Sequence, residues 1–344
     1  MSNLNSSRTI IILPDDTKKP IVDAIESAKK SIKIKMFVFS DPDLINAVIA
    51  AKKRGIEIQV MLNPARRSGE EENGETRKLL EAAGVEVKDS NPAFGLTHEK
   101  SMVIDEEVAF VKSLNWATKN LTVTRDYAIT TSHKHEVDEI VACFTADWDR
   151  KDFDPGEHAH MIWCKGNGRD RIARFIDEAK HTLFVQNERY QDSVIIERLV
   201  RAAVRGVKVH IMARPPHALK KDKLVEGVGG LRIMDDVGIK IHTLRHLKLH
   251  GKMLIADGCR AIVGSINLAP GSFDDRRELA IEVHDEDIVE RLQQIAQEDW
   301  KNSHPLDLTD EGLFADLENK GDGGDENLAL NIKKTDKHHD EEED

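Results

Sequence analysis

The sequence HGKMLIAD at residues 250–257 occurs a second time in the chain, as HEKSMVID at residues 98–105. In both stretches a histidine and a lysine two positions apart precede an apolar run, and an aspartate closes the run. Side chains alternate along an extended segment, so the histidine and the lysine are expected to point to the same side. The apolar run predicts a short buried strand with a turn at the aspartate. The fold therefore presents the same polar hairpin twice.

The match continues beyond the aspartate. Each copy is followed by a Ser-x-Asn pair and by an acidic residue 28 positions after the histidine. Core packing explains why apolar residues recur in a repeat, but it does not explain why polar residues recur at equal spacing. The repeated polar residues are therefore candidates for a chemical site. They are His98, Lys100, Asp105, Ser113, Asn115 and Asp126 in the first copy, and His250, Lys252, Asp257, Ser265, Asn267 and Glu278 in the second.

The rest of each hairpin gives these residues a common location. A second apolar strand, at residues 108–111 in the first copy and 260–263 in the second, leads to the serine and the asparagine. We expect this return of the chain to bring histidine, lysine, serine and asparagine within reach of one another. The copies differ at one neighbouring position, where the serine follows Lys112 in the first and Gly264 in the second. The lysine adds positive charge and restricts the approach of the backbone.

Strand and helix patterns alternate along the chain before the first motif. Residues 8–13, 32–39 and 56–62 are apolar runs typical of buried strands, whereas residues 20–30 have the spacing of an amphipathic helix. A further helix is expected to begin at Asp41-Pro42 and to end at Gly55. This alternation predicts an α/β fold with largely parallel strand pairing.

The same unit recurs 151 residues later. Ala28-Lys-Lys-Ser-Ile matches Ala179-Lys-His-Thr-Leu, and helices at about residues 136–148 and 285–300 would close the two halves. We expect an N-terminal lobe at residues 8–150 and a C-terminal lobe at residues 166–303. A pseudo-two-fold axis between the lobes would bring the two motifs face to face, much as in a symmetric dimer.

The acidity of the chain is concentrated at its end. The whole sequence carries a formal charge of −12, and residues 304–344, with 14 acidic residues and 4 lysines, account for −10 of it. This segment is poor in apolar residues, so we expect a disordered, solubilising tail. A sharper alternative is that the tail folds back over a basic groove and competes with substrate. The body is close to neutral, which leaves an anionic substrate open.

Several classes of protein are disfavoured by composition. No apolar run approaches the ~20 residues that a membrane span needs, and the N-terminus has no signal-peptide core. Three scattered cysteines do not suit a disulfide framework or a zinc site. We therefore expect a cytoplasmic protein, possibly peripheral at a membrane, with no metal and no cofactor.

The duplicated residues suit chemistry at a phosphodiester. One histidine can attack phosphorus and become a covalent phosphohistidine, while the other protonates the leaving oxygen and then activates water or an alcohol. The lysines and asparagines would stabilise the non-bridging oxygens, a task that other phosphoryl-transfer sites give to a metal. Asp126 and Glu278 would accept a hydrogen bond from an imidazole Nδ1 and fix its tautomer.

The paired HxKx4D motif with Ser-x-Asn and a trailing acid resembles the phospholipase D superfamily in its bilobal, duplicated form. The resemblance covers about residues 18–302. It implies two tandem phospholipase D-like α/β/α lobes and a metal-independent phosphodiesterase, with His98 the expected nucleophile and His250 the acid/base. The resemblance also implies that the phosphate is bound by Lys100, Lys252, Asn115 and Asn267, with assistance from Ser113 and Ser265. It implies that Asp126 and Glu278 support the histidines. Asp105 and Asp257 belong to the catalytic motifs, but their implied role is more structural than chemical.

The leading hypothesis is an enzyme of phospholipase D type that hydrolyses or transfers phospholipid head groups, as a monomer whose two lobes form one site. A transferase like cardiolipin synthase or phosphatidylserine synthase, and a nuclease, are the alternatives within the superfamily. A non-enzymatic interaction module or an inactive descendant is disfavoured because both motifs are complete. Arginines near the motifs, among them Arg214 and Arg277, are expected to be mostly solvated, with a few able to hold a head group or a nucleic-acid backbone.

Overall fold

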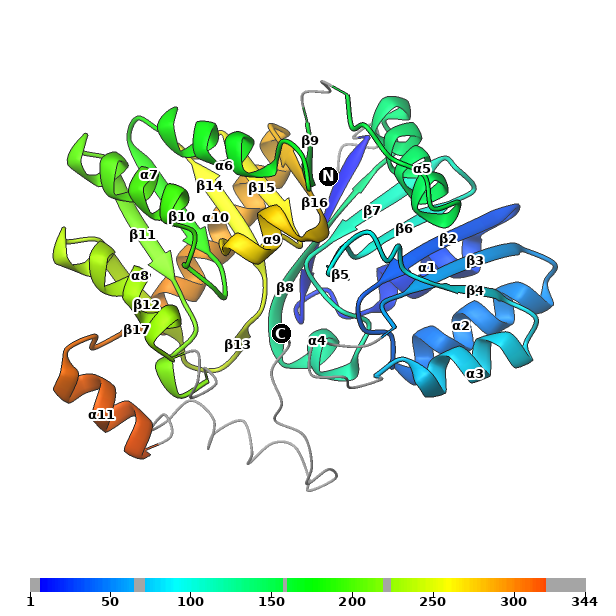
Figure 1. The fold of residues 1–344 in the computed structure, drawn as a ribbon, viewed down its shortest axis with the longest axis horizontal. Coiled ribbons are helices and arrows are strands. Elements are labelled where there is room, and N and C mark those ends of the chain that lie inside the picture. Colours follow the sequence, from blue (N-terminus) through cyan, green and yellow to red (C-terminus); the bar gives the residue numbers. More distant parts are fainter. Residues whose placement is uncertain (1–6, 65–71, 157–159, 219–223, 320–344) are drawn as a thin grey trace. The chain divides into compact units, whose positions relative to one another are not determined.

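The chain forms two compact α/β units in a computed structural model (Figure 1). The bounds of these units differ from the predicted lobes at residues 8–150 and 166–303, because residues 262–266 and 271–283 cluster with the N-terminal half of the chain. Unit 1 comprises residues 1–168, 262–266 and 271–283, and unit 2 comprises residues 169–261, 267–270 and 284–344. The structure describes residues 7–64, 72–156, 160–218 and 224–319.

The main sheet of unit 1 has the strand order β1-β8-β7-β6-β2-β3-β4. Among these seven strands, β2, β3 and β4 pair in parallel, and the other neighbours pair antiparallel. The prediction of largely parallel pairing is therefore wrong for this sheet, because the motif hairpin and the strands after it add antiparallel neighbours. The bounds are β1 (Arg8–Leu13), β2 (Ser31–Met36), β3 (Glu57–Leu62), β4 (Glu86–Asp89), β6 (Ser101–Ile104), β7 (Val108–Lys112) and β8 (Thr124–Thr131).

Helices cover both faces of this sheet. Helices α1, α2 and α3 lie on one face and α5 lies on the other (Figure 1). Asp41 begins α2, because its side chain accepts hydrogen bonds from the backbone N–H groups of Asp43 and Leu44. The face under α1 and α2 holds the apolar core, which includes Ile34 and Trp116. The bounds are α1 (Lys19–Ser27), α2 (Pro42–Lys53), α3 (Gly74–Ala82), α4 (Thr118–Thr122) and α5 (Lys134–Trp148).

Three further strands of unit 1 surround the first motif. β16 (Arg276–Val283) pairs in parallel with β5 (Leu96–Thr97) and antiparallel with β9 (Met161–Cys164). This pairing is the reason that part of the second motif belongs to unit 1. The chain passes from unit 2 into unit 1 within β15 (Arg260–Gly264), and α9 (Pro270–Asp274) lies just before β16.

Unit 2 repeats the same plan. Its strand order is β17-β12-β11-β10-β14, with parallel pairing from β10 to β12 and antiparallel pairing of β14 and β17 at the two edges. The strands are β10 (Thr182–Gln186), β11 (Lys208–Met212), β12 (Lys240–Leu244), β13 (Lys248–Leu249), β14 (Lys252–Ala256) and β17 (Ser303–Pro305). The helices are α6 (Gly168–Asp177), α7 (Ser193–Val204), η1 (Pro216–Ala218), α8 (Leu224–Asp236), α10 (Glu286–Lys301) and α11 (Asp310–Asn319).

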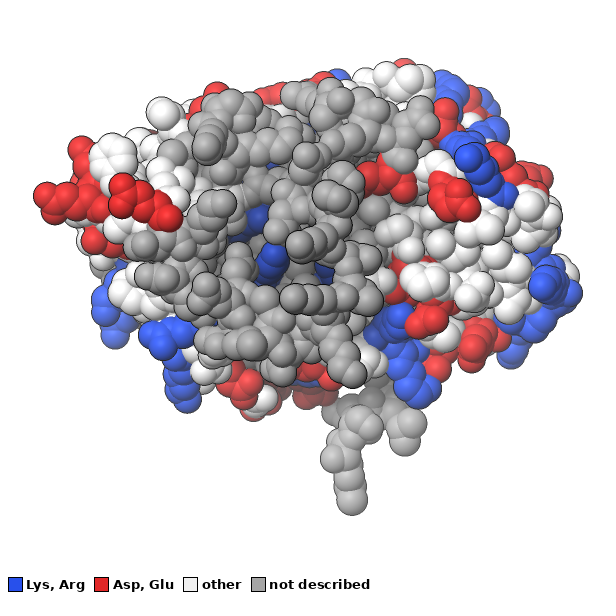
Figure 2. Space-filling model, turned by 90° about the horizontal axis from the view of Figure 1, so that it is seen from below, with Lys and Arg blue, Asp and Glu red and all other residues white. Residues whose placement is uncertain are grey.

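The prediction of a disordered tail from residue 304 is wrong for residues 304–319. Strand β17 pairs with β12, and α11 packs beside η1, where Asp316 accepts a 2.8 Å hydrogen bond from the backbone N–H of His217. Leu308 is buried. Arg232 also donates hydrogen bonds to the carbonyl of Leu308, at 2.8 Å, and to Asp310, at 2.5 Å. These contacts dock a segment whose acidic side chains gather at the left edge of Figure 2. Residues 320–344, and with them the hypothesis of a competing tail, lie outside the described residues.

Across the described part of the chain, no helix combines the length and the apolar character needed to cross a membrane.

Candidate active site

The aspartates that close the two motifs bind backbone rather than facing the histidines. Asp105 accepts hydrogen bonds of 2.6–3.2 Å from the N–H groups of residues 29–31, and Asp257 does the same for residues 180–182 at 2.7–2.9 Å. Both have left-handed backbone conformations, with φ of 54° and 53°, which aspartate tolerates better than most residues. Each stands at the far end of a strand from its histidine. This placement gives both aspartates a structural role and removes them from the catalytic set.

His98 lies directly after β5 and is held by β16. The backbone carbonyl of Arg277 accepts hydrogen bonds from the N–H groups of His98, at 3.0 Å, and Glu99, at 2.9 Å. The next residue, Glu278, brings its carboxylate to 2.9 Å from Nδ1 of His98, and the carbonyl of Ser265 lies 3.1 Å from the same nitrogen. Two acceptors at Nδ1 favour the tautomer that carries its proton there. Nε2 is then the unprotonated nitrogen of the neutral ring.

Glu278 comes from the second copy of the motif and serves the histidine of the first. Its carboxylate is fully buried and also accepts a 2.6 Å hydrogen bond from the hydroxyl of Ser265. Burial alone would raise the pKa of Glu278, but the charge of His98 and its hydrogen bond, helped by Arg276 and Lys100, hold that pKa below its ordinary value. Glu278 is therefore ionised at neutral pH and stabilises the charged imidazole.

The two motif serines hold the trailing acids. Ser113 donates a 2.6 Å hydrogen bond to Asp126, just as Ser265 does to Glu278, and Thr124 donates a second one to Asp126. Each hydroxyl also lies 3.2 Å from a backbone carbonyl oxygen, of Tyr127 for Ser113 and of Leu279 for Ser265, so its bond to the carboxylate is the shorter of the two. These bonds give both serines an orienting role, and their contribution to phosphate binding remains a prediction.

The motif lysines and asparagines are buried beside the histidines. Lys100 donates a 2.8 Å hydrogen bond to the backbone carbonyl of His98, and Lys252 donates a 2.6 Å bond to that of His250. The two ammonium groups thus share one local geometry, and each stands next to its histidine. Asn115 and Asn267 are 0% and 3% exposed. Their roles as phosphate ligands remain predictions.

The position before each motif serine is explained by packing. A Cβ on Gly264 would lie 2.3 Å from the Cα of Ala280 and 2.4 Å from the carbonyl oxygen of Leu279, so a side chain is excluded there. In the first copy Lys112 fills the corresponding place, with its ammonium group 4.4 Å from the centre of the Trp116 ring. Its Nζ is buried and has no hydrogen-bond partner among the described residues. Burial lowers the pKa of Lys112 well below its ordinary value.

A buried ionic cluster lies on the α5 side of His98. Lys35 donates hydrogen bonds to Glu99 at 2.8 Å and to Asp147 at 2.7 Å, and Arg277 binds Asp147 through two bonds of 2.9 and 3.0 Å. All four side chains are at most 4% exposed. Successive residues of a strand point to opposite faces, so β16 directs Glu278 to His98 and Arg277 to this cluster. Arg277 is therefore not one of the solvated arginines of the predicted set.

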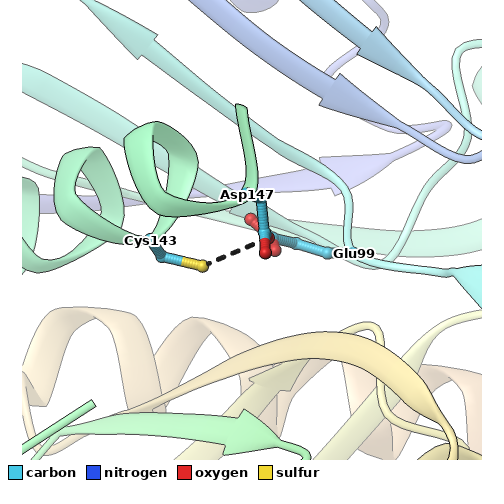
Figure 3. A group of neighbouring side chains, drawn as sticks. All are labelled: Glu99, Cys143 and Asp147. Atoms are coloured by element: carbon cyan, nitrogen blue, oxygen red, sulfur yellow. Dashed lines mark hydrogen bonds between the residues drawn. The ribbon is translucent and has the colours of Figure 1, made fainter. Parts of the chain in front are cut away.

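The same cluster contains three groups that resemble a metal-binding set. Figure 3 shows Glu99, Cys143 and Asp147 turned toward one another, and their ligand atoms lie within 4.8 Å. The ammonium group of Lys35 already bridges both carboxylates, and burial raises the pKa of the Cys143 thiol, which disfavours the thiolate that a metal would need. We interpret the group as an ion-pair network and not as a metal centre.

The sequence interpretation missed the partners that surround the repeated residues. Lys35, Glu99 and Asp147 lie near the first motif, and Glu188 lies near the second. Of these four, only Asp147 recurs, as Asp299 at the offset of 152 residues that the motifs share. A charged residue inside an apolar strand pattern, such as Lys35 in the run at residues 32–39, is the signal that would have found one of them. The recurrence of Asp147-Trp148 as Asp299-Trp300 is the signal that would have found the helix aspartate.

Comparison with known proteins supports the assignment of the motifs. A model of the family described as "Cardiolipin synthase, PLD-like domain" matches residues 21–148 and again residues 172–300. The chain belongs to this family. The double match confirms the resemblance to the phospholipase D superfamily and the presence of two tandem lobes.

Individual relatives act in more than one kind of reaction. Cardiolipin synthase B of Escherichia coli O6:H1 is 24% identical over 315 residues, which cover 79% of this chain and 75% of the relative. Polyphosphate kinase of Vibrio cholerae is 27% identical over 283 residues, which cover 76% of this chain but only 38% of the kinase. The structure of phosphatidylserine synthase from Haemophilus influenzae has a TM-score of 0.68 over 86% of this chain and 87% of that chain, at 12% identity, which is a likeness of fold.

Proposed function

We propose that this protein is a metal-independent phosphatidyltransferase that moves the phosphatidyl group of a phospholipid to a hydroxyl acceptor, either an alcohol or water. The observation that supports this most is the complete, duplicated motif whose first histidine is held at Nδ1 by the buried carboxylate of Glu278. Membership in the superfamily covers phosphodiesterases and phosphatidyltransferases, and the names of the cardiolipin and phosphatidylserine synthases favour a phospholipid substrate.

In the proposed reaction both histidines act on one phosphodiester. Nε2 of His98 attacks phosphorus, an N–P bond forms, and the P–O bond to the head group breaks as the leaving oxygen takes a proton from His250. His250 then removes the proton from the acceptor hydroxyl, whose oxygen attacks phosphorus and displaces His98. Water as acceptor gives hydrolysis, and an alcohol gives head-group transfer.

The surroundings of His98 suit the nucleophile. Its Nδ1 faces Glu278, which remains ionised at neutral pH and offsets the positive charge of the ring once Nε2 is bonded to phosphorus. Lys100 stands beside the ring and would bind a non-bridging oxygen as charge develops there. The two groups together favour attack by Nε2 and stabilise the covalent intermediate.

The substrate class is tested by comparing four substrates in the presence of EDTA. Vesicles of phosphatidylglycerol, vesicles of phosphatidylcholine, plasmid and single-stranded DNA, and polyphosphate with ADP are incubated separately with the protein. We expect head-group release or exchange in vesicles. Turnover of DNA alone would make the protein a nuclease, and turnover of polyphosphate alone would make it a phosphoryltransferase. Loss of all activity in EDTA would contradict the metal-independent mechanism.

The histidines are tested by substitution. His98→Asn and His250→Asn should each reduce turnover by about 10³-fold or more, because residues that act as a unit fail together. His135→Asn, at an exposed position on α5, is the matched control and should retain activity. A His98 or His250 variant with wild-type turnover would contradict the mechanism. Co-sedimentation with the same vesicles measures the peripheral membrane contact that a phospholipid substrate implies.

A further inference from the structure

The residue that packs against the motif histidine and lysine differs between the two copies. It is Phe37 in unit 1 and Glu188, 151 positions later, in unit 2. The positions are equivalent in the fold, because Phe39 and Tyr190, two residues further on, each form an isolated parallel bridge to the residue that follows the Ser-x-Asn pair. An aromatic ring in one copy thus corresponds to a carboxylate in the other.

In unit 1 the ring packs against the catalytic pair. Phe37 makes an edge contact with the ring of His98, with centroids 5.1 Å apart, and Nζ of Lys100 lies 5.2 Å from the Phe37 centroid. Phenylalanine at this position places no negative charge of its own beside His98 and Lys100, in contrast to the carboxylate of unit 2.

In unit 2 the carboxylate is held by two cations and turned toward the imidazole. One oxygen of Glu188, Oε2, accepts a 2.5 Å hydrogen bond from Lys252 and lies 4.0 Å from Nε2 of His250. The other oxygen, Oε1, accepts a 3.3 Å bond from Arg214. The side chains of Glu188 and His250 are both 7% exposed. This arrangement fixes a carboxylate oxygen beside a catalytic nitrogen.

The fold of the repeat does not require this carboxylate. Burying an ion pair carries a desolvation cost that apolar packing avoids, and unit 1 forms the same bend after its strand with phenylalanine. Glu188 lies beside His250 although folding does not require it there. We therefore expect this carboxylate to act in substrate recognition. An ionised carboxylate has no proton to donate to a phosphate oxygen, but it accepts hydrogen bonds from hydroxyl groups.

We propose that Glu188 is a specificity-determining residue that selects an acceptor with two neighbouring hydroxyl groups, an inference that rests on the proposed phosphatidyl transfer. One hydroxyl donates a hydrogen bond to Oε2 of Glu188. The other gives its proton to Nε2 of His250 while its oxygen forms the new P–O bond and the N–P bond at His98 breaks. The 4.0 Å between Oε2 and Nε2 suits two hydroxyls on adjacent carbons.

The test uses a pair of acceptors that differ by one hydroxyl, 1,2-propanediol and 1-propanol. Both compete at equal concentration for the phosphatidyl group of phosphatidylglycerol vesicles, and the two products are quantified by mass spectrometry. The wild-type protein should favour the diol by about 10- to 100-fold, the range for a hydrogen bond to a charged group. Glu188→Gln should bring the ratio close to one while transfer to 1-propanol continues.

Two variants complete the design. Glu197→Gln, at a half-buried glutamate on α7 that pairs with Arg201, is the matched control and should keep the wild-type ratio. Glu188→Asp retains the charge but withdraws it from His250, so it should lower the ratio as well, and it serves if Glu188→Gln does not fold. A folded Glu188 variant with the wild-type ratio would overturn the inference, and so would one that transfers to neither alcohol. Wild-type protein without any transfer would overturn the proposed function and the inference together.

Discussion

The polar layer between the sheet and its closing helix holds an ammonium–carboxylate pair in unit 1 and an amide–carboxylate pair in unit 2. Lys35 of β2 binds Asp147 of α5 at 2.7 Å. At the equivalent positions of unit 2, Gln186 of β10 donates a 2.9 Å hydrogen bond to Asp299 of α10. The helix aspartate is common to both units, and its partner has changed from an ammonium group to an amide.

The difference extends to the motif itself. The residue between histidine and lysine is Glu99 in the first motif and Gly251 in the second. Glu99 balances the positive charge of Lys35. Gln186, which replaces Lys35 in unit 2, carries no charge, so no acidic residue is required at Gly251. The comparison shows that the same backbone arrangement accepts either a lysine–carboxylate or an amide–carboxylate pair. The lysine–carboxylate pair lies beside His98, which Glu99 follows in sequence and whose backbone N–H donates to the carbonyl of Arg277.

The largest expected effect is the loss of the helix aspartate in unit 1. Asp147→Asn leaves Lys35 and Arg277 as buried charges with too few acceptors, which should lower the free energy of unfolding by about 3–5 kcal/mol. The matched variant Asp299→Asn weakens an amide–carboxylate hydrogen bond and should cost about 2 kcal/mol. Urea denaturation of both variants measures the difference. Equal losses would show that the two layers are energetically alike.

A double-mutant cycle tests whether the charges of unit 1 act as a pair. Lys35→Gln and Glu99→Gln should each destabilise the protein, because each leaves an uncompensated buried charge. The double variant approaches the composition of unit 2, so its loss should be smaller than the sum of the single losses by about 2 kcal/mol. The free energy of unfolding is measured by urea titration for the wild-type protein, the two single variants and the double variant. Additive losses would mean that the pair contributes no coupling.

Acid should weaken unit 1 through Asp147. Burial alone would raise the pKa of Asp147, but Lys35 and Arg277 outweigh it and lower the pKa from 3.8 to about 2. The folded form therefore binds this proton less readily than the unfolded form, and the stabilisation is present above pH ~4 and lost as the pH falls toward 2. The shift corresponds to about 2 kcal/mol. Unfolding measured between pH 2 and 6 should show this loss in wild type, and a similar slope in Asp147→Asn would assign it elsewhere.

The smallest effect is expected where the two units are alike. Asp105→Asn and Asp257→Asn each weaken hydrogen bonds to three backbone N–H groups, and asparagine tolerates the left-handed conformation of these positions. Each variant should lose about 1 kcal/mol of stability, as for a lost helix cap, with turnover per folded molecule retained. Thermal unfolding and vesicle assays measure both. Loss of turnover in a folded Asp105 variant would return that residue to the catalytic set.

The sequence was sufficient for the repeat and for the strands and helices that carry the motifs. Equal spacing of polar residues located His98 and His250, and the trailing Glu278 was expected to serve a histidine. The partner was not foreseeable, because Glu278 serves the histidine of the other copy, and this depends on β16 pairing with β5. Spacing along the chain does not encode which strands meet.

Charge and composition were weaker guides than the repeat. Buried ions such as Lys35 and Asp147 are invisible to a rule that assigns charged residues to the surface, because each is buried only with its partner. The acidic composition after residue 304 likewise predicted disorder where the chain forms β17 and α11. These two elements are ordered by contacts to β12 and η1. The burial of the charged residues and the order of residues 304–319 both depend on contacts between elements that are distant in sequence.

The most direct test of the proposed mechanism is to trap the covalent intermediate. The His250→Asn variant is incubated with phosphatidylglycerol vesicles, quenched in base, in which phosphohistidine is stable, and mapped by peptide mass spectrometry. The account predicts a phosphatidyl adduct on His98, because Glu278 holds Nδ1 and leaves Nε2 as the nucleophile. An adduct on His250 in the corresponding His98→Asn variant, with none on His98 in the His250→Asn variant, would contradict it.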